Sequence, residues 1–215
     1  MKFSSVEIQG GRGKLLKNTL FSVEDGGKGL ALLFPGAGYT CDMPALYYPR
    51  NILLSQKYDV LSLEYSFQTV GEVFNTDLVA EVLLDGEKTL ESIQAREYPE
   101  IFLVGKSLGT RVLTHLLNKY EELNRTKAVY LTPVFSKEFN AATAGLKQEI
   151  LMAIGTEDPF YHLDMIQELQ SQLDFKLLVL EKADHGLEVP KDCLRSLEIM
   201  KAVCEEIQKF ITDTK

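Results

Sequence analysis

Cysteine, histidine and long apolar segments are all scarce in this sequence of 215 residues. The three cysteines, Cys41, Cys193 and Cys204, are too few and too scattered for a disulfide framework or for the usual spacing of zinc ligands. No apolar segment is long enough to cross a bilayer, and residues 1–14 lack the continuous apolar stretch of a secretory signal. We therefore expect free thiols and a cytoplasmic location.

The sequence is also short of positive charge. It has 23 lysines and arginines against 31 aspartates and glutamates, which gives a formal net charge of −8. Nucleic acids and anionic membranes repel a protein of net negative charge, and no dense run of lysine or arginine offsets that repulsion. We therefore expect neither a nucleic acid nor a membrane among its partners. The sequence leaves the oligomeric state open.

Short apolar segments alternate along the chain with longer segments of helical period. The apolar segments predict strands at residues 3–8, 19–23, 29–34, 58–66, 101–105, 127–133, 149–155 and 175–181. The amphipathic segments predict helices at residues 43–57, 74–96, 107–123, 161–173 and 192–212.

This alternation predicts an α/β fold with a mostly parallel β-sheet and helices on both faces. The first two strands, joined by the glycine-rich segment QGGRGK, are expected to form an antiparallel hairpin at one edge. No repeat or linker interrupts the chain, so residues 1–215 are predicted to be a single domain. In open sheets of this kind, ligands bind beyond the carboxyl ends of the strands. Functional residues are therefore sought just after each strand.

The segment IFLVGKSLGT, residues 101–110, fits two different kinds of site. A phosphate-binding loop would need a glycine five residues before Gly105, and that position is Glu100. The residues between them are predicted strand, so no loop is available to surround a phosphate. The other glycine-rich segment, GGRGKLL, lacks the Ser or Thr that would bind magnesium. The phosphate interpretation therefore fails.

The alternative is a nucleophile elbow, a tight turn between a strand and a helix with a serine at its tip. Gly105, Ser107 and Gly109 have the required spacing, and the glycines let the strand and the helix approach closely. A simple helix-capping serine would give the same local pattern. Ser107 therefore needs partners elsewhere in the chain.

A serine nucleophile needs an imidazole to accept its proton and a carboxylate to orient that imidazole. Of the three histidines, His115 falls inside a predicted helix and His162 begins one, which leaves His185 after the last strand. Glu157 and Asp158 follow the preceding strand, so a carboxylate and an imidazole both stand at strand ends. Their chain order after the serine is the order of this kind of triad.

Attack by a serine on a carbonyl group also needs two backbone N–H groups that face the carbonyl oxygen, where negative charge develops (the oxyanion). Leu108, directly after the serine, would supply one of them. Ala37 lies between Gly36 and Gly38 after another predicted strand, so its amide could supply the second. A plain glycine-rich turn would look the same in isolation.

Taken together, the segments FPGAG, GKSLG, GTEDP and ADHGL resemble those of the α/β-hydrolase superfamily over essentially the whole chain. The resemblance implies that Ser107 is the nucleophile, that His185 is the general base and then acid, and that Asp158 is the orienting acid. It also implies that Ala37 and Leu108 provide the oxyanion hole. No metal and no cofactor is called for.

Two acidic residues compete with Asp158 for the third role. Glu157 is its neighbour, but the superfamily usually places the acid three residues past the glycine that ends the strand. Asp184 is adjacent to His185, so its side chain should point away from the imidazole. Residues 133–148 are too few for a helical cap domain, so the site should be open, as in small dienelactone-hydrolase-like and lysophospholipase-like members.

Apolar and aromatic residues near strand ends suggest an uncharged or weakly polar acyl substrate of small size. At least half of them are expected to fill the core instead. The candidate pocket residues are Tyr39, Phe67, Phe135, Phe160 and Leu187, with Met43, Val134 and Tyr161 nearby. Lys106 is interpreted as a solvated surface lysine and Cys41 as a small buried thiol.

The leading hypothesis is a serine hydrolase that cleaves a carboxylic ester or thioester through an acyl-enzyme intermediate. An acyltransferase or a peptidase would use the same residues. The alternative from another class is a non-catalytic member of the fold that binds a ligand or partner.

Overall fold

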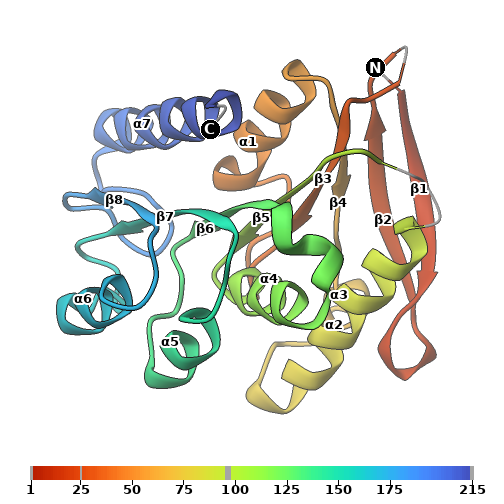
Figure 1. The fold of residues 1–215 in the computed structure, drawn as a ribbon, viewed down its shortest axis with the longest axis horizontal. Coiled ribbons are helices and arrows are strands. Elements are labelled where there is room, and N and C mark those ends of the chain that lie inside the picture. The colour runs from red at the N-terminus through yellow and green to blue at the C-terminus, as the bar shows by residue number, and fades with distance from the viewer. Residues whose placement is uncertain (1, 25, 95–97, 214–215) are drawn as a thin grey trace.

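The computed structural model describes residues 2–24, 26–94 and 98–213 and contains one eight-stranded sheet (Figure 1). The strands are β1 (Lys2–Gln9), β2 (Leu15–Ser22), β3 (Gly29–Phe34), β4 (Tyr58–Ser62), β5 (Ile101–Lys106), β6 (Lys127–Leu131), β7 (Glu149–Gly155) and β8 (Lys176–Leu180). The helices are α1 (Pro44–Ser55), α2 (Ser66–Thr69), α3 (Val79–Gln94), α4 (Leu108–Lys119), α5 (Lys137–Thr143), α6 (Leu163–Gln170) and α7 (Cys193–Thr212). Short 3-10 turns lie at Gly11–Gly13, Thr76–Leu78 and Glu121–Arg125.

The strand order is β1-β2-β4-β3-β5-β6-β7-β8. Strand β2 pairs antiparallel with both β1 and β4, and all remaining neighbours are parallel. The predicted fold class, a mostly parallel sheet with an N-terminal antiparallel hairpin, is confirmed. The parallel register brings the carboxyl ends of β3, β5, β6, β7 and β8 to one edge of the sheet, where the turns that follow them meet.

Helices cover both faces of the sheet (Figure 1). Helices α1 and α7 pack together on one face, and α3, α4, α5 and α6 lie on the other. The middle of strand β5 shows why its sequence is apolar: Leu103 belongs to the core under α4, whereas Phe102 and Val104 belong to the core under α1 and α7. Successive side chains point to opposite faces, so residues 101–104 are apolar on both sides, and Lys106 at the carboxyl end is the polar exception.

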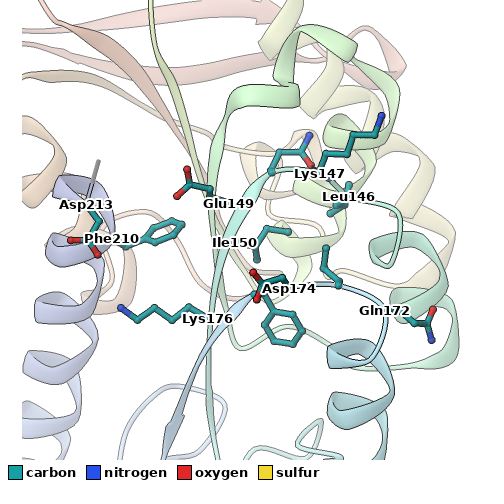
Figure 2. A pocket seen from close by; sticks show the side chains of 12 residues that line it. Leu146, Lys147, Glu149, Ile150, Gln172, Asp174, Lys176, Phe210 and Asp213 are labelled. Atoms are coloured by element: carbon teal, nitrogen blue, oxygen red, sulfur yellow. Dashed lines mark hydrogen bonds between the residues drawn. The ribbon is translucent and has the colours of Figure 1, made fainter. Parts of the chain in front are cut away.

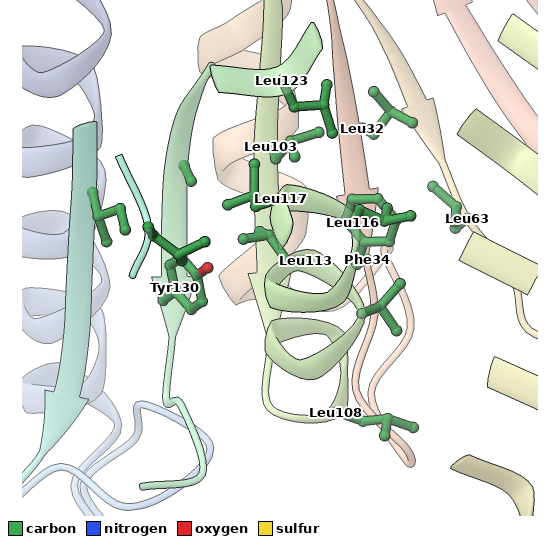
Figure 3. Close-up of a cluster of buried hydrophobic side chains, with 14 of the residues drawn as sticks. Leu32, Phe34, Leu63, Leu103, Leu108, Leu113, Leu116, Leu117, Leu123 and Tyr130 are labelled. Atoms are coloured by element: carbon green, nitrogen blue, oxygen red, sulfur yellow. The ribbon is translucent and has the colours of Figure 1, made fainter. Parts of the chain in front are cut away.

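The core under α4 is formed largely by leucines from the helix and the sheet (Figure 3). Leu113, Leu116 and Leu117 recur on one side of α4 at helical spacing and are buried against the sheet. Each buried leucine contributes about 1.5–3 kcal/mol relative to an exposed one. This packing holds the first turn of α4, which follows Ser107, against the end of β5.

Helices α2, α3 and α5 differ from the sequence-based prediction, and α2, with only four residues, was not predicted. Helix α3 begins at Val79, because the Asn75 side chain accepts a hydrogen bond from the Asp77 N–H and caps a 3-10 turn before it. The predicted end of this helix at residue 96 lies outside the described residues. Helix α5 was not predicted, although Ser136 caps it by accepting a hydrogen bond from the Phe139 N–H.

The connection from β6 to β7, residues 132–148, contains only the short helix α5. The prediction that no cap domain covers the sheet at this point is confirmed.

Candidate active site

Ser107 occupies a strained turn between β5 and α4. Its φ of 51° and ψ of −111° lie in a region that non-glycine residues rarely adopt. A Cβ on Gly105 would lie 2.7 Å from the Gly109 carbonyl oxygen, and a Cβ on Gly109 would lie 2.1 Å from the Phe34 carbonyl oxygen. Both positions therefore require glycine, which is the physical reason for the Gly-x-Ser-x-Gly spacing.

The structure brings Ser107, His185 and Asp158 together, from the turns after β5, β8 and β7. The Ser107 Oγ lies 2.8 Å from the His185 Nε2, and the Asp158 Oδ2 lies 2.8 Å from the His185 Nδ1. The His185 side chain is 32% exposed, whereas the Asp158 carboxylate is 0% exposed. The imidazole thus faces solvent on one side and a buried carboxylate on the other.

A close backbone contact between the turns after β7 and β8 sets this geometry. A Cβ on Gly155 would lie 1.9 Å from the Ala183 carbonyl oxygen, and that carbonyl accepts a hydrogen bond from the Glu157 N–H. The Phe160 N–H donates to the Asp158 Oδ1 at 2.9 Å, which leaves the other carboxylate oxygen facing the imidazole. The two turns therefore hold the Asp158 carboxylate and the His185 imidazole against each other.

The two competing acids have other positions. Glu157 is exposed. The Asp184 Oδ1 accepts hydrogen bonds from the Gly186 N–H at 2.7 Å and the Glu188 N–H at 3.1 Å, so it shapes the loop around His185. Asp158 is the carboxylate in contact with the imidazole.

The turn after β3 lies directly beside the serine. A Cβ on Gly36 would lie 3.5 Å from the Ser107 Cβ, and the turn is closed by a hydrogen bond from the Gly36 N–H to the Tyr39 carbonyl. Leu108 directly follows Ser107 and is the first residue of α4. The two predicted oxyanion residues, Ala37 and Leu108, are therefore the next residues in sequence after Gly36 and Ser107.

Gln68 is a residue near this turn that the sequence did not reveal. Its Nε2 donates to the Gly36 carbonyl at 2.9 Å, and its Oε1 accepts from the Tyr65 N–H. In a trans peptide the carbonyl and the next N–H point in opposite directions. Gln68 therefore fixes the direction of the Ala37 N–H. Its signal was weak, because α2 has only four residues.

The expectation that Lys106 is solvated is wrong. Its side chain is 1% exposed, and its Nζ donates to the Thr132 Oγ1 and to the His185 carbonyl, each at 2.6 Å. Lys106 is the last residue of β5, and its side chain lies on the same face of the sheet as Val104. The turns after β3, β6 and β8 close over it there.

The predicted pocket residues divide into two groups. Phe67 and Phe135 are 1% and 2% exposed and pack on other aromatic rings in the core, so they offer no surface to a substrate. Tyr39 and Phe160 are half-buried, and the Phe160 ring makes an edge contact with the imidazole at 5.4 Å between centroids. Leu187 is buried and is one of the residues that line a neighbouring pocket.

This neighbouring pocket has a volume of about 430 Å³ and lies between α1, α7 and the loop after His185. Its apolar lining residues include Pro44, Leu187, Val189, Leu197 and Met200. Leu187, one of its lining residues, is two residues after His185 in the sequence.

A second pocket of about 580 Å³ lies at the opposite edge of the sheet (Figure 2). Glu149 and Lys176, the first residues of β7 and β8, line it together with Phe210 near the end of α7. Ligands of open α/β sheets bind at the carboxyl ends of strands, and this pocket is at the amino ends. It is remote from the serine and its partners.

Cys41 is the cysteine nearest in sequence to the turn after β3. Burial raises the pKa of its thiol to about 12, which keeps it protonated and confirms it as a buried thiol. Within the described residues, no group of three or more His, Cys, Asp or Glu side chains could hold a metal ion. None of the described helices has the length and apolar character needed to span a bilayer.

A nucleophile-elbow turn at the carboxyl edge of a mostly parallel sheet is the arrangement of the α/β hydrolases. A family model for the alpha/beta hydrolase domain matches residues 28–212, and the chain belongs to this family. No curated protein sequence matches the chain.

Solved structures of similar fold cover nearly the whole chain. An α/β serine hydrolase homologue from Coxiella burnetii is 14% identical, with a TM-score of 0.74 over 96% of this chain and 98% of that one. An α/β serine hydrolase without a lid from Xanthomonas campestris is 13% identical, with a TM-score of 0.72 over 100% and 98%. A putative dienelactone hydrolase from Klebsiella pneumoniae is 13% identical, with a TM-score of 0.74 over 99% and 100%. At these identities the likeness establishes a shared fold.

Proposed function

We propose that this protein is a serine hydrolase that cleaves carboxylic esters or thioesters through an acyl-enzyme intermediate. The observation that carries the proposal is the continuous contact from the Ser107 Oγ through the His185 imidazole to the Asp158 carboxylate, with 2.8 Å at each step. These distances permit direct proton transfer from the hydroxyl to the ring.

In the first half of the proposed reaction, Ser107 attacks the carbonyl carbon of the substrate. Asp158 accepts the Nδ1–H of His185, which leaves the Nε2 lone pair free to take the proton from the hydroxyl. The amides of Ala37 and Leu108 stabilise the negative charge on the carbonyl oxygen. The imidazolium then gives its proton to the departing alkoxide or thiolate, and the acyl group stays on Ser107.

In the second half, water takes the place of the alcohol or thiol. His185 removes a proton from that water, which attacks the acyl carbon, and then returns the proton to the Ser107 oxygen. The products are a carboxylic acid and the regenerated enzyme. Each step uses the same base and the same oxyanion hole.

The residues around Ser107 and His185 favour a substrate with an uncharged acyl group. The pocket of about 430 Å³ beside Leu187 has a mostly apolar lining, which supports apolar contact with an acyl chain. Phe160, against the imidazole, and Tyr39, on the oxyanion turn, are half-buried and offer further apolar surface.

A fluorophosphonate probe tests the proposal directly. We expect it to modify the folded wild-type protein at Ser107, with the modified peptide identified by mass spectrometry, because the probe requires a serine activated by a base. Heat-denatured protein is the control and should stay unmodified. An unmodified folded protein, or a probe attached elsewhere, would contradict the proposal.

The length of the acyl chain is expected to affect turnover. We expect kcat/KM for p-nitrophenyl esters to rise from the acetate to a medium-length chain, since each buried methylene contributes about 0.8 kcal/mol, or roughly a fourfold gain. A flat response across the series would exclude an apolar acyl site beside the triad.

Phe160→Ala tests the ring packed on the base. Because the edge contact between Phe160 and His185 helps to orient the imidazole, we expect a fall in kcat of about 2- to 10-fold, in line with the usual strength of such contacts. Phe160→Leu keeps apolar bulk at this position and should lose less. An unchanged kcat in the alanine variant would show that the ring does not orient the base.

A further inference from the structure

The buried amine of Lys106 has no part in the mechanism above, yet it contacts three of the turns that form the site. Its Nζ donates to the backbone carbonyl of His185 and to the Thr132 Oγ1, each at 2.6 Å, and lies 5.0 Å from the centre of the Tyr39 ring. Burying an ammonium group is costly unless it is paired. Two hydrogen bonds and an aromatic face offset that cost here.

Among the described residues, three of the six non-glycine residues with a positive φ lie near this amine or its hydrogen-bond partners. Thr132 has a φ of 47° although it is a β-branched residue, Ser107 has a φ of 51°, and Leu187 has a φ of 63°. Thr132 supplies one acceptor to Lys106, Ser107 is its neighbour in sequence, and Leu187 lies two residues beyond the other acceptor. Such strain persists where the surrounding contacts over-determine the backbone, and it gathers at functional sites.

We propose that Lys106 is the positioning residue of the general base: its ammonium group ties the His185 backbone to the strand that carries the nucleophile, and its charge disfavours a resting imidazolium. This inference rests on the proposed function. The nucleophile and the residue that anchors its base are adjacent in sequence. A shift of β5 therefore moves both together, and the Ser107–His185 distance is preserved.

The charge of Lys106 follows from the groups around it. Burial lowers the pKa of Lys106 to about 8, while the nearby carboxylates of Asp158 and Asp184 act in the opposite direction. The amine is therefore mostly protonated at neutral pH and loses its charge above pH 8. The groups that face the imidazole itself are the Asp158 carboxylate, the Ser107 hydroxyl and the Phe160 ring. Lys106 contacts the backbone carbonyl of the same residue, and a cation held that close disfavours a positive charge on the ring.

Histidine NMR titration of the full chain measures this effect without any substrate. The protein has three histidines, so a His185→Ala spectrum assigns the signal of interest. In Lys106→Met we expect the titration curve of His185 to move to higher pH, because a neighbouring cation has been removed. The wild-type signal should show a second inflection near pH 8, where Lys106 loses its proton, and the variant should not.

Two further variants separate charge from structure. Lys106→Gln keeps a hydrogen-bond donor without the charge and should shift the midpoint as Lys106→Met does, so it also serves if the methionine variant does not fold. Lys106→Arg keeps the charge and should leave the midpoint near that of the wild type. Lys201→Met, which removes an exposed lysine of α7, is the matched control and should change nothing.

Ester hydrolysis provides the second measurement. We expect Lys106→Met to lower kcat by about 10- to 100-fold with KM nearly unchanged, as a displaced base would. A fall in kcat with an unchanged His185 titration would show a merely structural lysine and overturn the proposal, as would an unchanged kcat. If the wild-type Ser107 resists the fluorophosphonate probe, the proposed function fails, whereas the titration still decides whether Lys106 acts on the imidazole.

Discussion

Asp158→Asn is expected to lower kcat for ester hydrolysis by about 1,000- to 10,000-fold while the protein stays folded. The Phe160 N–H donates to the Asp158 Oδ1, so an asparagine would keep its oxygen there and turn its NH₂ group toward His185. That NH₂ group would donate to Nδ1 and force the ring proton onto Nε2. The imidazole could then no longer accept the Ser107 proton. Steady-state kinetics with p-nitrophenyl acetate measure this loss.

Variants of the two other nearby carboxylates serve as controls for Asp158→Asn. Glu157→Gln removes the exposed neighbouring carboxylate and should keep kcat close to that of the wild type. Asp184→Asn keeps the oxygen that accepts from the Gly186 N–H and should cost far less than Asp158→Asn. Ser107→Ala defines the rate without a nucleophile. If Glu157→Gln or Asp184→Asn caused the larger loss, Asp158 would not be the acid.

Gly155→Ala should destabilise the protein and impair the site at the same time. The new Cβ would lie 1.9 Å from the Ala183 carbonyl oxygen, so the turns after β7 and β8 would have to separate. We expect a loss of about 3 kcal/mol in the free energy of unfolding, which for a chain of this size is roughly 6–12 °C in Tm. Because these turns carry Asp158 and His185, kcat should fall as well. Thermal denaturation and ester turnover measure the two effects.

The control for this variant is Gly145→Ala. Gly145 is exposed after α5, and a Cβ there would meet no atom within 4 Å. Its Tm should stay within a degree or two of the wild-type value. If both variants had the same Tm, close packing of the two turns would not explain the requirement for glycine at 155.

Most of the fold could be predicted from the sequence because the buried strands are apolar on both faces. Residues such as Phe102, Leu103 and Val104 follow one another without a polar position, and this pattern is typical of a short strand covered by helices on both sides. Helix α5 and helix α2 were harder to recognise. Each is short, and neither continues for enough turns to show a helical period.

Part of the candidate site could be predicted because its residues directly follow strands that lie side by side in a parallel sheet. Ser107, Asp158 and His185 each follow a strand, and parallel pairing brings those strand ends to one edge. Lys106 and Gln68 were not predictable in the same way. A lysine is usually exposed, and the atoms that accept its hydrogen bonds lie 26 and 79 residues away in sequence. The Gln68 contact depends equally on a distant turn, at Gly36.

The short connection between β6 and β7 has a consequence for the fate of the proposed acyl-enzyme intermediate. An enzyme that hands an acyl group to a chosen acceptor must keep bulk water out during the lifetime of that intermediate. Helix α5 is the only helix in residues 132–148, and the His185 ring, which would activate the incoming nucleophile, is in contact with solvent. We therefore expect water to react with the acyl-enzyme faster than other acceptors do, so that the main product is the free carboxylic acid.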